Sequence, residues 1–351
     1  MFNFKIDEPS AGLREVLDAL ASHGITEDSR NGPVIRFPAP VCLEYVNPRR
    51  RLLTDPLRDA NPFFHLFETL WMFAGMDEIQ PLLLFNSGMA QYSDDGVKLR
   101  GTAYGHRWRS KWGDQLRTVI QKLTDNPEDR RIVMSMWDPA EIFLREGKDF
   151  ACNLQVLFST RPAVYKGSSP STKEFQRRLL DMTVTNRSND VIYGAMGSNM
   201  FHFSMLHELV AHHANLELGT YYQMANNLHL YTEMDTQKKI WQSRNDIMAV
   251  SDESPDHSLT DEDAPMDIFQ YGTYVRSSGS EMPTNSYLKN VVHPLISAYR
   301  IYKTKTLTGI EVPLSRRYDM AISLIEHCSS RQLREACAAW MNKRIRDSRS
   351  K

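Results

Sequence analysis

Two stretches of the chain carry apolar residues at the spacing of an amphipathic helix. The first is 56–75, PLRDANPFFHLFETLWMFAG, in which Asn61 suits the N-cap, Pro62 the first turn and Gly75 the end. The second is 114–124, DQLRTVIQKLT. We therefore predict a helix at both places.

The middle of the chain alternates between apolar and polar residues, which is typical of strands. The pattern predicts strands at 132–137, 152–160, 179–186 and 220–231, and a helix at 199–215. We expect the strands at 152–160 and 179–186 to be neighbours. Strands and helices follow no regular strand–helix–strand order, so the predicted fold class is α+β rather than a doubly wound sheet.

Polar segments divide the chain into three predicted regions. A basic stretch at 161–178, with Gly, Ser and Pro, is expected to be a long excursion between two strands. Residues 251–265 are acidic, and we expect 251–285 to form a polar surface insertion after a main domain at 1–250. Residues 286–351 have a helical pattern, and we predict that this C-terminal extension packs on the same domain.

Composition excludes several classes of protein. Apolar residues make up 41 % of the 351 residues and charged residues 24 %, as in an average soluble globular protein. The chain has 42 Lys and Arg against 43 Asp and Glu, so its net charge of −1 gives no long-range attraction for nucleic acid or an anionic membrane. No apolar run reaches membrane-spanning length, and MFNFKIDEPS does not resemble a secretory signal.

The four cysteines are scattered and form no CxxC pair; they are Cys42, Cys152, Cys328 and Cys337. In a chain of this length they do not indicate a disulfide framework. We therefore expect a reducing, cytoplasmic location. There a lone cysteine is either a buried apolar residue or a nucleophile.

Cys152, at the start of an alternating strand, is the candidate nucleophile. A cysteine in such a place is more often part of a core than catalytic. A reactive thiol needs positive charge nearby to lower its pKa, and Arg187, which follows the next strand, can supply that charge and also bind a phosphate. The adjacent Arg130 and Arg131 suit an oxyanion ligand, because guanidinium binds phosphate bidentately; equally, they can be solvated charges in a turn.

Other polar residues have two interpretations each. His229 and Tyr231 share one face of a predicted strand, where they can contact a sugar hydroxyl or simply be the polar tips of a half-buried sheet. Glu68 lies in an apolar helix, either at a hydrated edge or buried as a general acid. HELVAH is similar to the zinc motif HExxH, but His207 and His212 are five apart and diverge by roughly 140° on a helix. We expect no metal, and the glycines form no phosphate-binding loop.

Six motifs stand in a specific order between about residues 60 and 233. They are FHLFETLWMFAG, YGHRWR, DQLRTVIQKLTDNPEDRRIVMSMWDPAE, FACN, NRSNDVIYGAMGSN and NLHLY. Together they resemble thymidylate synthases and the related bacteriophage pyrimidine hydroxymethylases. The resemblance implies a thymidylate synthase-like mixed sheet with flanking helices, and a catalytic domain at 1–250. It also implies folate-dependent one-carbon transfer to C5 of a deoxypyrimidine monophosphate, with 5,10-methylenetetrahydrofolate as the cofactor.

The resemblance implies catalytic roles for five residues. Cys152 matches the nucleophile that adds to C6 of the pyrimidine, Glu68 the acid that acts through water on the base carbonyl, and Tyr104 the tyrosine near C5. Asp190 matches the aspartate that contacts the pterin ring of the folate. Asn153 stands where the family has a histidine that orders water near the base.

Five residues match phosphate contacts of the family. Arg187 and Ser188 match those beside the thiolate, and Arg30, in SRNG, matches an arginine of an N-terminal loop. Arg130 and Arg131 match the pair that reaches the phosphate bound by the partner subunit. The resemblance therefore implies an obligate homodimer.

Three further residues match contacts to the base and sugar. His229 and Tyr231 match the pair on the 3′-hydroxyl, and Asn199 matches the side chain that reads the base edge. An amide can both donate and accept, which suits N3–H and O4 of uracil, whereas cytosine-specific relatives have an aspartate there. dUMP is thus favoured, and hydroxymethylation of dCMP is an alternative.

The sequence departs from the synthases at four places. Ala-Cys-Asn at 151–153 replaces Pro-Cys-His, and the loop between Asp190 and Asn199 is one residue longer. NSGMAQYSDDG, at 86–96, lacks a tryptophan that synthases pack against the reacting methylene, and the basic end RIRDSRSK differs from their apolar tail. The loss of the tryptophan and the loss of the apolar tail would each let water reach the methylene. Hydroxymethylation is therefore favoured, with reductive methylation of dUMP to dTMP as the alternative.

Two other classes of function remain as competing interpretations. A non-catalytic nucleotide-binding dimer would keep the pocket, but it needs no thiol at position 152. Nucleic-acid binding through 161–178 and the basic C-terminus is disfavoured by the neutral overall charge.

Overall fold

The structure is a computed structural model, and it describes residues 1–144, 146–163, 177–247, 268–283, 285–307 and 310–349. The chain divides into two compact units that interleave along the sequence. The first unit consists of Met1–Arg51, Trp112–Asp138 and Cys152–Val250, and the second of Leu52–Lys111, Pro139–Ala151 and Ser251–Lys351.

The first unit is built on a six-stranded sheet with parallel and antiparallel pairs. Its strands, in spatial order, are β1 (Phe2–Ile6), β4 (Val41–Tyr45), β9 (Glu217–Ala225), β7 (Arg178–Asn186), β6 (Asn153–Pro162) and β5 (Val133–Ser135). The predicted neighbours β6 and β7 pair antiparallel. The α+β fold class with a mixed sheet is therefore confirmed. Residues 164–176 of the expected excursion lie outside the described residues.

The first unit also contains a four-stranded sheet, and this sheet shows that the prediction of a single strand at 220–231 was wrong. Its strands, in order, are β2 (Ile25–Glu27), β3 (Val34–Arg36), β10 (Leu228–Tyr231) and β8 (Asn189–Asp190). The predicted strand at 220–231 is in fact two strands, β9 and β10, in different sheets. Asn226 and Asn227 separate them: the Asn226 N–H donates to Asn186 O at 2.9 Å, and Asn227 O accepts from the Asn189 N–H at 2.8 Å. Asparagine tolerates such turns, and alternation alone does not show them.

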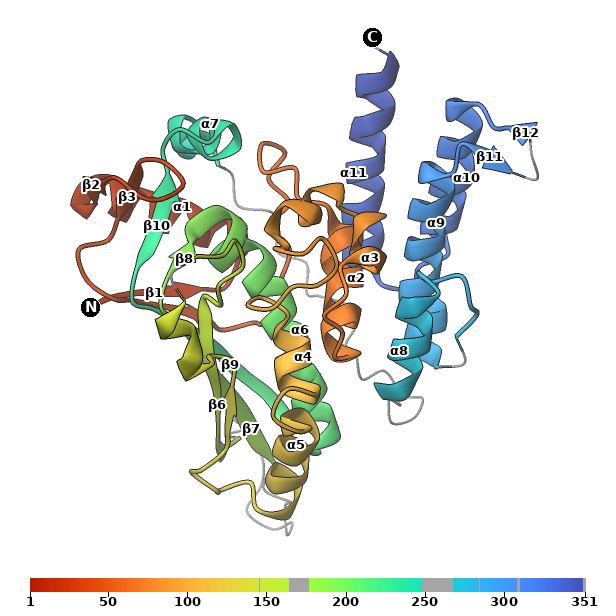
Figure 1. The fold of residues 1–351 in the computed structure, drawn as a ribbon. Coiled ribbons are helices and arrows are strands. Elements are labelled where there is room, and N and C mark those ends of the chain that lie inside the picture. Colours follow the sequence, from red (N-terminus) through yellow and green to blue (C-terminus); the bar gives the residue numbers. More distant parts are fainter. Residues whose placement is uncertain (145, 164–176, 248–267, 284, 308–309, 350–351) are drawn as a thin grey trace, which may run out of the picture. The chain divides into compact units, whose positions relative to one another are not determined.

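Helices α5 (Gln115–Asp125) and α6 (Asn199–His213) lie on one face of the six-stranded sheet, as Figure 1 shows. Both were predicted. The Asp114 carboxylate caps α5 by accepting from the Arg117 N–H at 3.0 Å. Nearly all side chains of α6 are buried. This explains why the helix carries apolar residues on almost every side rather than along one stripe. The remaining elements of this unit are α1 (Pro9–His23), η3 (Val191–Ser198), α7 (Asp235–Gln242) and η4 (Arg244–Asp246).

His207, on α6, is fully buried and makes folding sensitive to acid. Its Nε2–H donates to Leu180 O at 2.7 Å, and burial lowers its pKa to about 4. The unfolded chain therefore binds a proton below about pH 6.5 that the folded chain does not bind until about pH 4. We expect up to about 3 kcal/mol of stability to be lost as the pH falls across this window. Urea unfolding at pH 7 and pH 4.5 measures the loss.

The matched variant is His207→Gln, which keeps a side-chain N–H donor for Leu180 but cannot titrate. It should lose much less stability between the two pH values than the parent. The neighbouring Glu208 is a poor alternative cause: ion pairs with Arg51 and Arg49 outweigh its burial and hold its pKa below the usual value. Equal pH dependence in parent and variant would contradict the assignment to His207.

The second unit is helical. Its elements are α2 (Pro62–Phe73), α3 (Gln80–Leu83), η1 (Ser87–Tyr92), α4 (Tyr104–Arg109), η2 (Pro139–Phe143), α8 (Ile268–Arg276), η5 (Leu288–Val292), α9 (His293–Lys303), β11 (Thr306–Leu307), β12 (Ile310–Glu311), α10 (Leu314–Glu326) and α11 (Arg331–Arg349). Helix α2 was predicted, and the Asn61 side chain caps it by accepting from the Phe64 N–H at 3.2 Å. Helices α8, α9 and α11 all contact α2.

Part of the predicted polar insertion at 251–285 is a helix, α8. Tyr271, Tyr274 and Val275 follow each other at helical spacing and are buried. The acidic residues at the beginning of the 251–285 segment led to the prediction of a surface insertion, but the apolar residues nearer its end form a buried helix. Residues 251–267 lie outside the described residues. The predicted helical pattern after residue 286 agrees with α9, α10 and α11.

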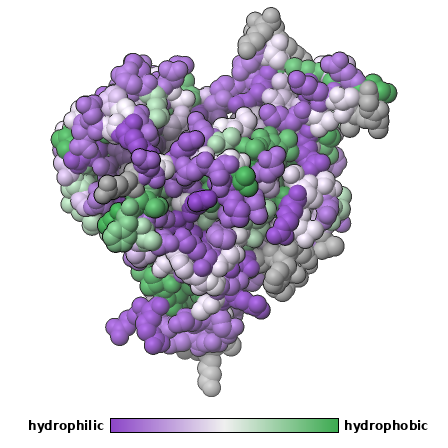
Figure 2. Space-filling model, in the orientation of Figure 1, coloured by the Kyte–Doolittle hydropathy of each residue, from purple (hydrophilic) through white to green (hydrophobic). Residues whose placement is uncertain are grey.

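On the face drawn in Figure 2, hydrophilic residues predominate and hydrophobic ones form separate small groups. Among the helices that the structure describes, none combines the length and the apolar character needed to cross a bilayer.

Candidate active site

Cys152 lies immediately before β6, and its backbone is bonded to the predicted phosphate-binding residue. Its carbonyl oxygen accepts from the Arg187 N–H at 2.9 Å. Cys152 is half-buried, whereas Cys42, Cys328 and Cys337 are buried. Burial raises the pKa of the Cys42 and Cys337 thiols. Cys152 is therefore the most accessible of the four thiols.

Asparagine side chains connect the residue after Cys152 to the predicted base-reading residue. Asn153 Oδ1 accepts from Asn186 Nδ2 and, at 3.3 Å, from Asn199 Nδ2. Asn199 Nδ2 also donates to Asn189 Oδ1 at 3.1 Å. The two predicted residues, Asn153 and Asn199, are thus neighbours, held by two asparagines that the sequence analysis did not single out.

A second group joins the predicted pterin-binding residue to the predicted sugar-binding pair. His229, on β10, is the register partner of Asp190 on β8, and the rings of His229 and Tyr231 meet edge to face at 5.1 Å. Gln237, on α7, donates to Asp190 Oδ2 at 2.7 Å and accepts from the Tyr231 N–H at 2.8 Å. The Tyr193 N–H donates to the other carboxylate oxygen of Asp190 at 2.5 Å.

Burial affects the two titrating groups of this cluster in opposite directions. It raises the pKa of the Asp190 carboxyl, although hydrogen bonds from the backbone and the charge of His229 oppose the change. It lowers the pKa of His229, although the charge of Asp190 opposes that change. The cluster therefore presents a fixed carboxyl group and, near neutral pH, an uncharged imidazole.

The remaining predicted phosphate ligands of the first unit lie at its surface. Arg30 is exposed in the turn between β2 and β3, and Ser188 is half-buried between β7 and β8. Arg130 and Arg131 are exposed in the turn before β5. Arg131 holds Asp129 with two hydrogen bonds from one edge of its guanidinium, Nε to Oδ1 at 2.9 Å and Nη2 to Oδ2 at 3.1 Å, and this hydrogen bonding lowers the pKa of Asp129 to about 2. The same planar group can bind a phosphate.

Glu68 and Tyr104 belong to the second unit. Glu68 is half-buried on α2 among buried neighbours, and Tyr104 is buried at the start of α4. The next residue, Gly105, packs directly on the backbone of α2, because a Cβ there would overlap Met72 O. Tyr104 is thereby held against α2 within this unit.

The segment that leads into Cys152 is fixed within the second unit. The buried Glu141 carboxylate pairs with Arg107 of α4 and accepts from the Ala151 N–H at 3.3 Å. Asp149 accepts from the backbone N–H groups of Gly101 and Thr102, at 2.7 and 2.9 Å. The residues just before the thiol are therefore not a loose loop.

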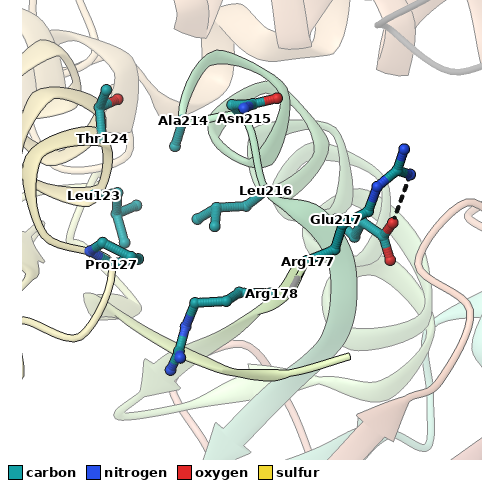
Figure 3. A pocket seen from close by; sticks show the side chains of 9 residues that line it. All are labelled: Leu123, Thr124, Pro127, Arg177, Arg178, Ala214, Asn215, Leu216 and Glu217. Carbon is teal, nitrogen blue, oxygen red and sulfur yellow. Dashed lines mark hydrogen bonds and ion pairs between the residues drawn. The ribbon is translucent and has the colours of Figure 1, made fainter. Parts of the chain in front are cut away.

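A separate cavity of about 680 Å³ lies at the other end of the six-stranded sheet, where α5 ends and β7 and β9 begin. Figure 3 shows its lining, including the ion pair between Arg177 and Glu217 at 2.9 Å. None of the predicted site residues lines it. We do not assign this cavity to the chemistry of Cys152.

Comparison with known proteins identifies the family. The family model of thymidylate synthase matches residues 49–274. The chain belongs to the thymidylate synthase family. Enzymes of this family use 5,10-methylenetetrahydrofolate.

Two similar relatives are bacteriophage enzymes. The chain is 47 % identical over 223 residues to the deoxyuridylate hydroxymethyltransferase of Pseudomonas phage M6. The matched region covers 63 % of this chain and 59 % of the relative. It is 32 % identical over 271 residues to the deoxyuridylate hydroxymethyltransferase of Bacillus phage SP01, covering 73 % and 66 % respectively. The chain thus spans about three-fifths to two-thirds of the length of these relatives.

A solved structure supports the fold. The crystal structure of thymidylate synthase from T4 phage superposes with a TM-score of 0.51 at 21 % identity, covering 69 % of this chain and 82 % of that one. At this identity the likeness supports the fold alone. The predicted thymidylate synthase-like fold is therefore confirmed.

Four amide residues of the candidate site were not predicted from the sequence: Asn186, Asn189, Gln223 and Gln237. A signal was present for one of them. Gln223 interrupts an apolar strand with an inward-facing amide, and buried amides are rarely without hydrogen-bond partners.

Proposed function

We propose that this protein transfers a hydroxymethyl group to C5 of dUMP, with Cys152 as the nucleophile. The observation that carries the proposal is the half-buried Cys152 beside Arg187, next to the paired amides of Asn153 and Asn199. The phage relatives are named for the same reaction. The net reaction consumes dUMP, water and 5,10-methylenetetrahydrofolate and yields 5-hydroxymethyl-dUMP and tetrahydrofolate.

Cys152 and its neighbours activate the base. C5 of uracil is a weak nucleophile, and addition of the Cys152 thiolate to C6 converts the ring into an enolate with negative charge on O4. Arg187 stabilises the thiolate and binds the 5′-phosphate together with Ser188, Arg30 and the partner's arginine pair. Asn199 accepts from N3–H and donates to O4, where the charge develops, so it binds the enolate more strongly than the neutral ring.

Further groups act on protons and on the sugar. Glu68 works through a water molecule at O4, Asn153 orders water beside the base, and Tyr104 acts near C5, where a proton must leave. The uncharged His229 and the Tyr231 hydroxyl hydrogen-bond the 3′-hydroxyl, which orients the ring over the thiolate.

The Asp190 cluster has the chemistry to hold a folate. The carboxyl group is fixed by Gln237 and by the backbone N–H of Tyr193, so its acceptor directions are set before a ligand arrives. A pterin ring offers amino and ring N–H donors, which pair with such a carboxylate. Bound there, 5,10-methylenetetrahydrofolate supplies the one-carbon unit.

Water rather than hydride completes the proposed reaction. In the second unit, residues 86–96 carry no tryptophan, and the only aromatic residue among them, Tyr92, is exposed. No aromatic ring is therefore expected to shield the carbon at C5 from water at that point.

The test is the identity of the product formed from dUMP and 5,10-methylenetetrahydrofolate. We expect release of tritium from 5-tritiated dUMP, and mass spectrometry should find 5-hydroxymethyl-dUMP. Sole formation of dTMP would replace hydroxymethylation by reductive methylation. Turnover of dCMP but not dUMP would assign the enzyme to cytosine, and nucleotide binding without any turnover would favour a non-catalytic dimer.

We also infer a homodimer formed through the six-stranded sheet. The face of the sheet opposite α6 carries a row of register partners, Val133, Leu157, Thr183 and Tyr222, that are exposed or half-buried. Met224, one row away, is 37 % exposed. Apolar side chains exposed on the face of a sheet are usually covered by another layer, and a second copy supplies one. Arg130 and Arg131 precede β5 of the same sheet, in the turn from which they would reach the partner's phosphate.

The four thiols suit a reducing compartment, and we infer a cytoplasmic enzyme. None of them forms a disulfide in the structure. Oxidation sensitivity of activity, reversed by dithiothreitol, is the corresponding expectation.

A further inference from the structure

A line of buried amides runs from a backbone carbonyl to the base-reading residue. Gln223 Nε2 donates to Ala195 O at 3.0 Å, and Gln223 Oε1 accepts from Asn189 Nδ2 at 2.8 Å. Asn189 Oδ1 in turn accepts from Asn199 Nδ2 at 3.1 Å. Gln223, on β9, is fully buried, and Asn189 is 4 % exposed.

The backbone carbonyl fixes the direction of every hydrogen bond in this line. Ala195 O can only accept, so the NH2 group of Gln223 must face it and the oxygen of Gln223 must face Asn189. Asn189 must then donate to Gln223 and present its own oxygen to Asn199. Tyr45 reinforces the first step, because its hydroxyl donates to Ala195 O at 2.7 Å and accepts from Gln223 Nε2 at 3.3 Å.

Close packing prevents the middle amide from moving away. A Cβ on Gly194 would overlap Asn189 Oδ1, so the backbone of Gly194 lies directly against the Asn189 amide. A reversed amide would put two oxygens together or two NH2 groups together inside the protein. Leaving such buried groups without partners costs about 1–3 kcal/mol each.

The last amide of the line is therefore oriented. One proton of Asn199 Nδ2 is committed to Asn189. Its other polar contacts, with Asn153, are long, at 3.3 Å from Nδ2 and 3.4 Å to Oδ1, and are the ones that a ligand can replace. Asn199 thus presents one acceptor and one donor side by side.

This arrangement matches uracil and not cytosine. Uracil offers N3–H as a donor and O4 as an acceptor on adjacent positions, whereas cytosine offers N3 as an acceptor and the 4-amino group as a donor. An Asn199 side chain free to rotate by 180° could serve either base. One that is held in a single orientation serves uracil alone.

We infer that Gln223 is a specificity-determining positioning residue: through Asn189 it fixes the orientation of the Asn199 amide and so selects uracil over cytosine. This inference rests on the proposed function, because it requires that Asn199 contacts the base. Gln223 itself touches no substrate. Its effect is on the choice of base rather than on the thiolate chemistry.

The test compares kcat/KM for dUMP and for dCMP in the parent and in Gln223→Met, which keeps the volume and removes the three hydrogen bonds of the amide, to Ala195 O, Asn189 and Tyr45. We expect the preference for dUMP over dCMP to fall about tenfold or more, mainly through a higher KM for dUMP. Gln223→Glu, whose neutral form keeps an oxygen for Asn189 and a proton for Ala195 O, should retain the preference within about threefold. Ser204→Ala removes another buried hydrogen bond, to Phe201 O on α6, and should leave the preference unchanged.

Each outcome decides between the alternatives. A folded Gln223→Met with an unchanged preference overturns the inference, as does an equal loss of preference in Ser204→Ala. If Gln223→Met does not fold, Asn189→Ser carries the same test, since serine is smaller and interrupts the line at its middle. Calorimetric binding of dUMP and dCMP to parent and variants is measured alongside turnover. A parent that binds dUMP but converts neither nucleotide refutes the proposed function, whereas the binding preference still tests the role of Gln223.

Discussion

Replacing Cys152 with alanine is expected to lower the turnover of dUMP by at least about 10⁴-fold, because no other group can form the covalent bond at C6. dUMP binding should change less than about threefold, since the phosphate, sugar and base contacts remain. Release of tritium from 5-tritiated dUMP measures turnover, and calorimetry measures binding.

The matched control is Cys42→Ala, which removes a buried thiol from the same unit and is expected to keep near-parental turnover. Undiminished tritium release by Cys152→Ala would show that Cys152 is not the nucleophile. Loss of both turnover and binding in a folded protein would instead assign Cys152 a structural role.

The second large effect concerns Arg130 and Arg131. The double variant Arg130→Ala/Arg131→Ala should lose about 100-fold or more in kcat/KM, because charge-assisted hydrogen bonds to the phosphate contribute about 1.5–3 kcal/mol each. In the structure Arg131 binds Asp129, so a phosphate bound on the same edge of the guanidinium has to replace that carboxylate. If these arginines serve the partner's site, the double variant and Cys152→Ala should complement each other.

The activity that complementation restores can be calculated. Mixed dimers contain one site with both the thiol and the arginines, and one with neither. Random mixing of equal amounts should therefore restore about a quarter of the parental activity per subunit. Arg161→Ala, which removes another exposed arginine of the same sheet, is the control and should need no complementation. Mixed dimers without activity would show that the arginines act within their own subunit.

Much of the fold follows from local patterns. Helix α2 has its cap, its proline and its terminal glycine in the sequence, and α5 has its capping aspartate. Strands β6 and β7 alternate clearly and pair as predicted. These elements were predictable because their signals lie within one turn or one strand of the residues that they organise.

The errors come from long-range contacts. The 220–231 stretch alternates as one strand, and only pairing with Asn186 and Asn189 divides it between two sheets. Helix α8 follows an acidic stretch, and its burial shows only once the unit is formed. Contacts between residues that lie far apart in the chain decide both cases, and periodicity does not contain that information.

The candidate site likewise contains residues that could be predicted from the sequence and residues that could not. The residues that match family motifs were named from the sequence, and the first unit brings Cys152 to Arg187, Asn153 to Asn199, and Asp190 to His229. The amides that orient them, Gln223 and Gln237 above all, were not named. Their importance lies in the direction of hydrogen bonds, which depends on partners in other elements.

A crystal structure of the protein with dUMP bound would show directly whether Cys152 is the nucleophile. A nucleophilic role predicts that the Cys152 Sγ atom lies within about 3.5 Å of C6 of the ring, or is covalently bonded to it, with the phosphate on Arg187. A fully occupied nucleotide whose C6 lies well beyond contact distance of that sulfur in every copy would contradict it.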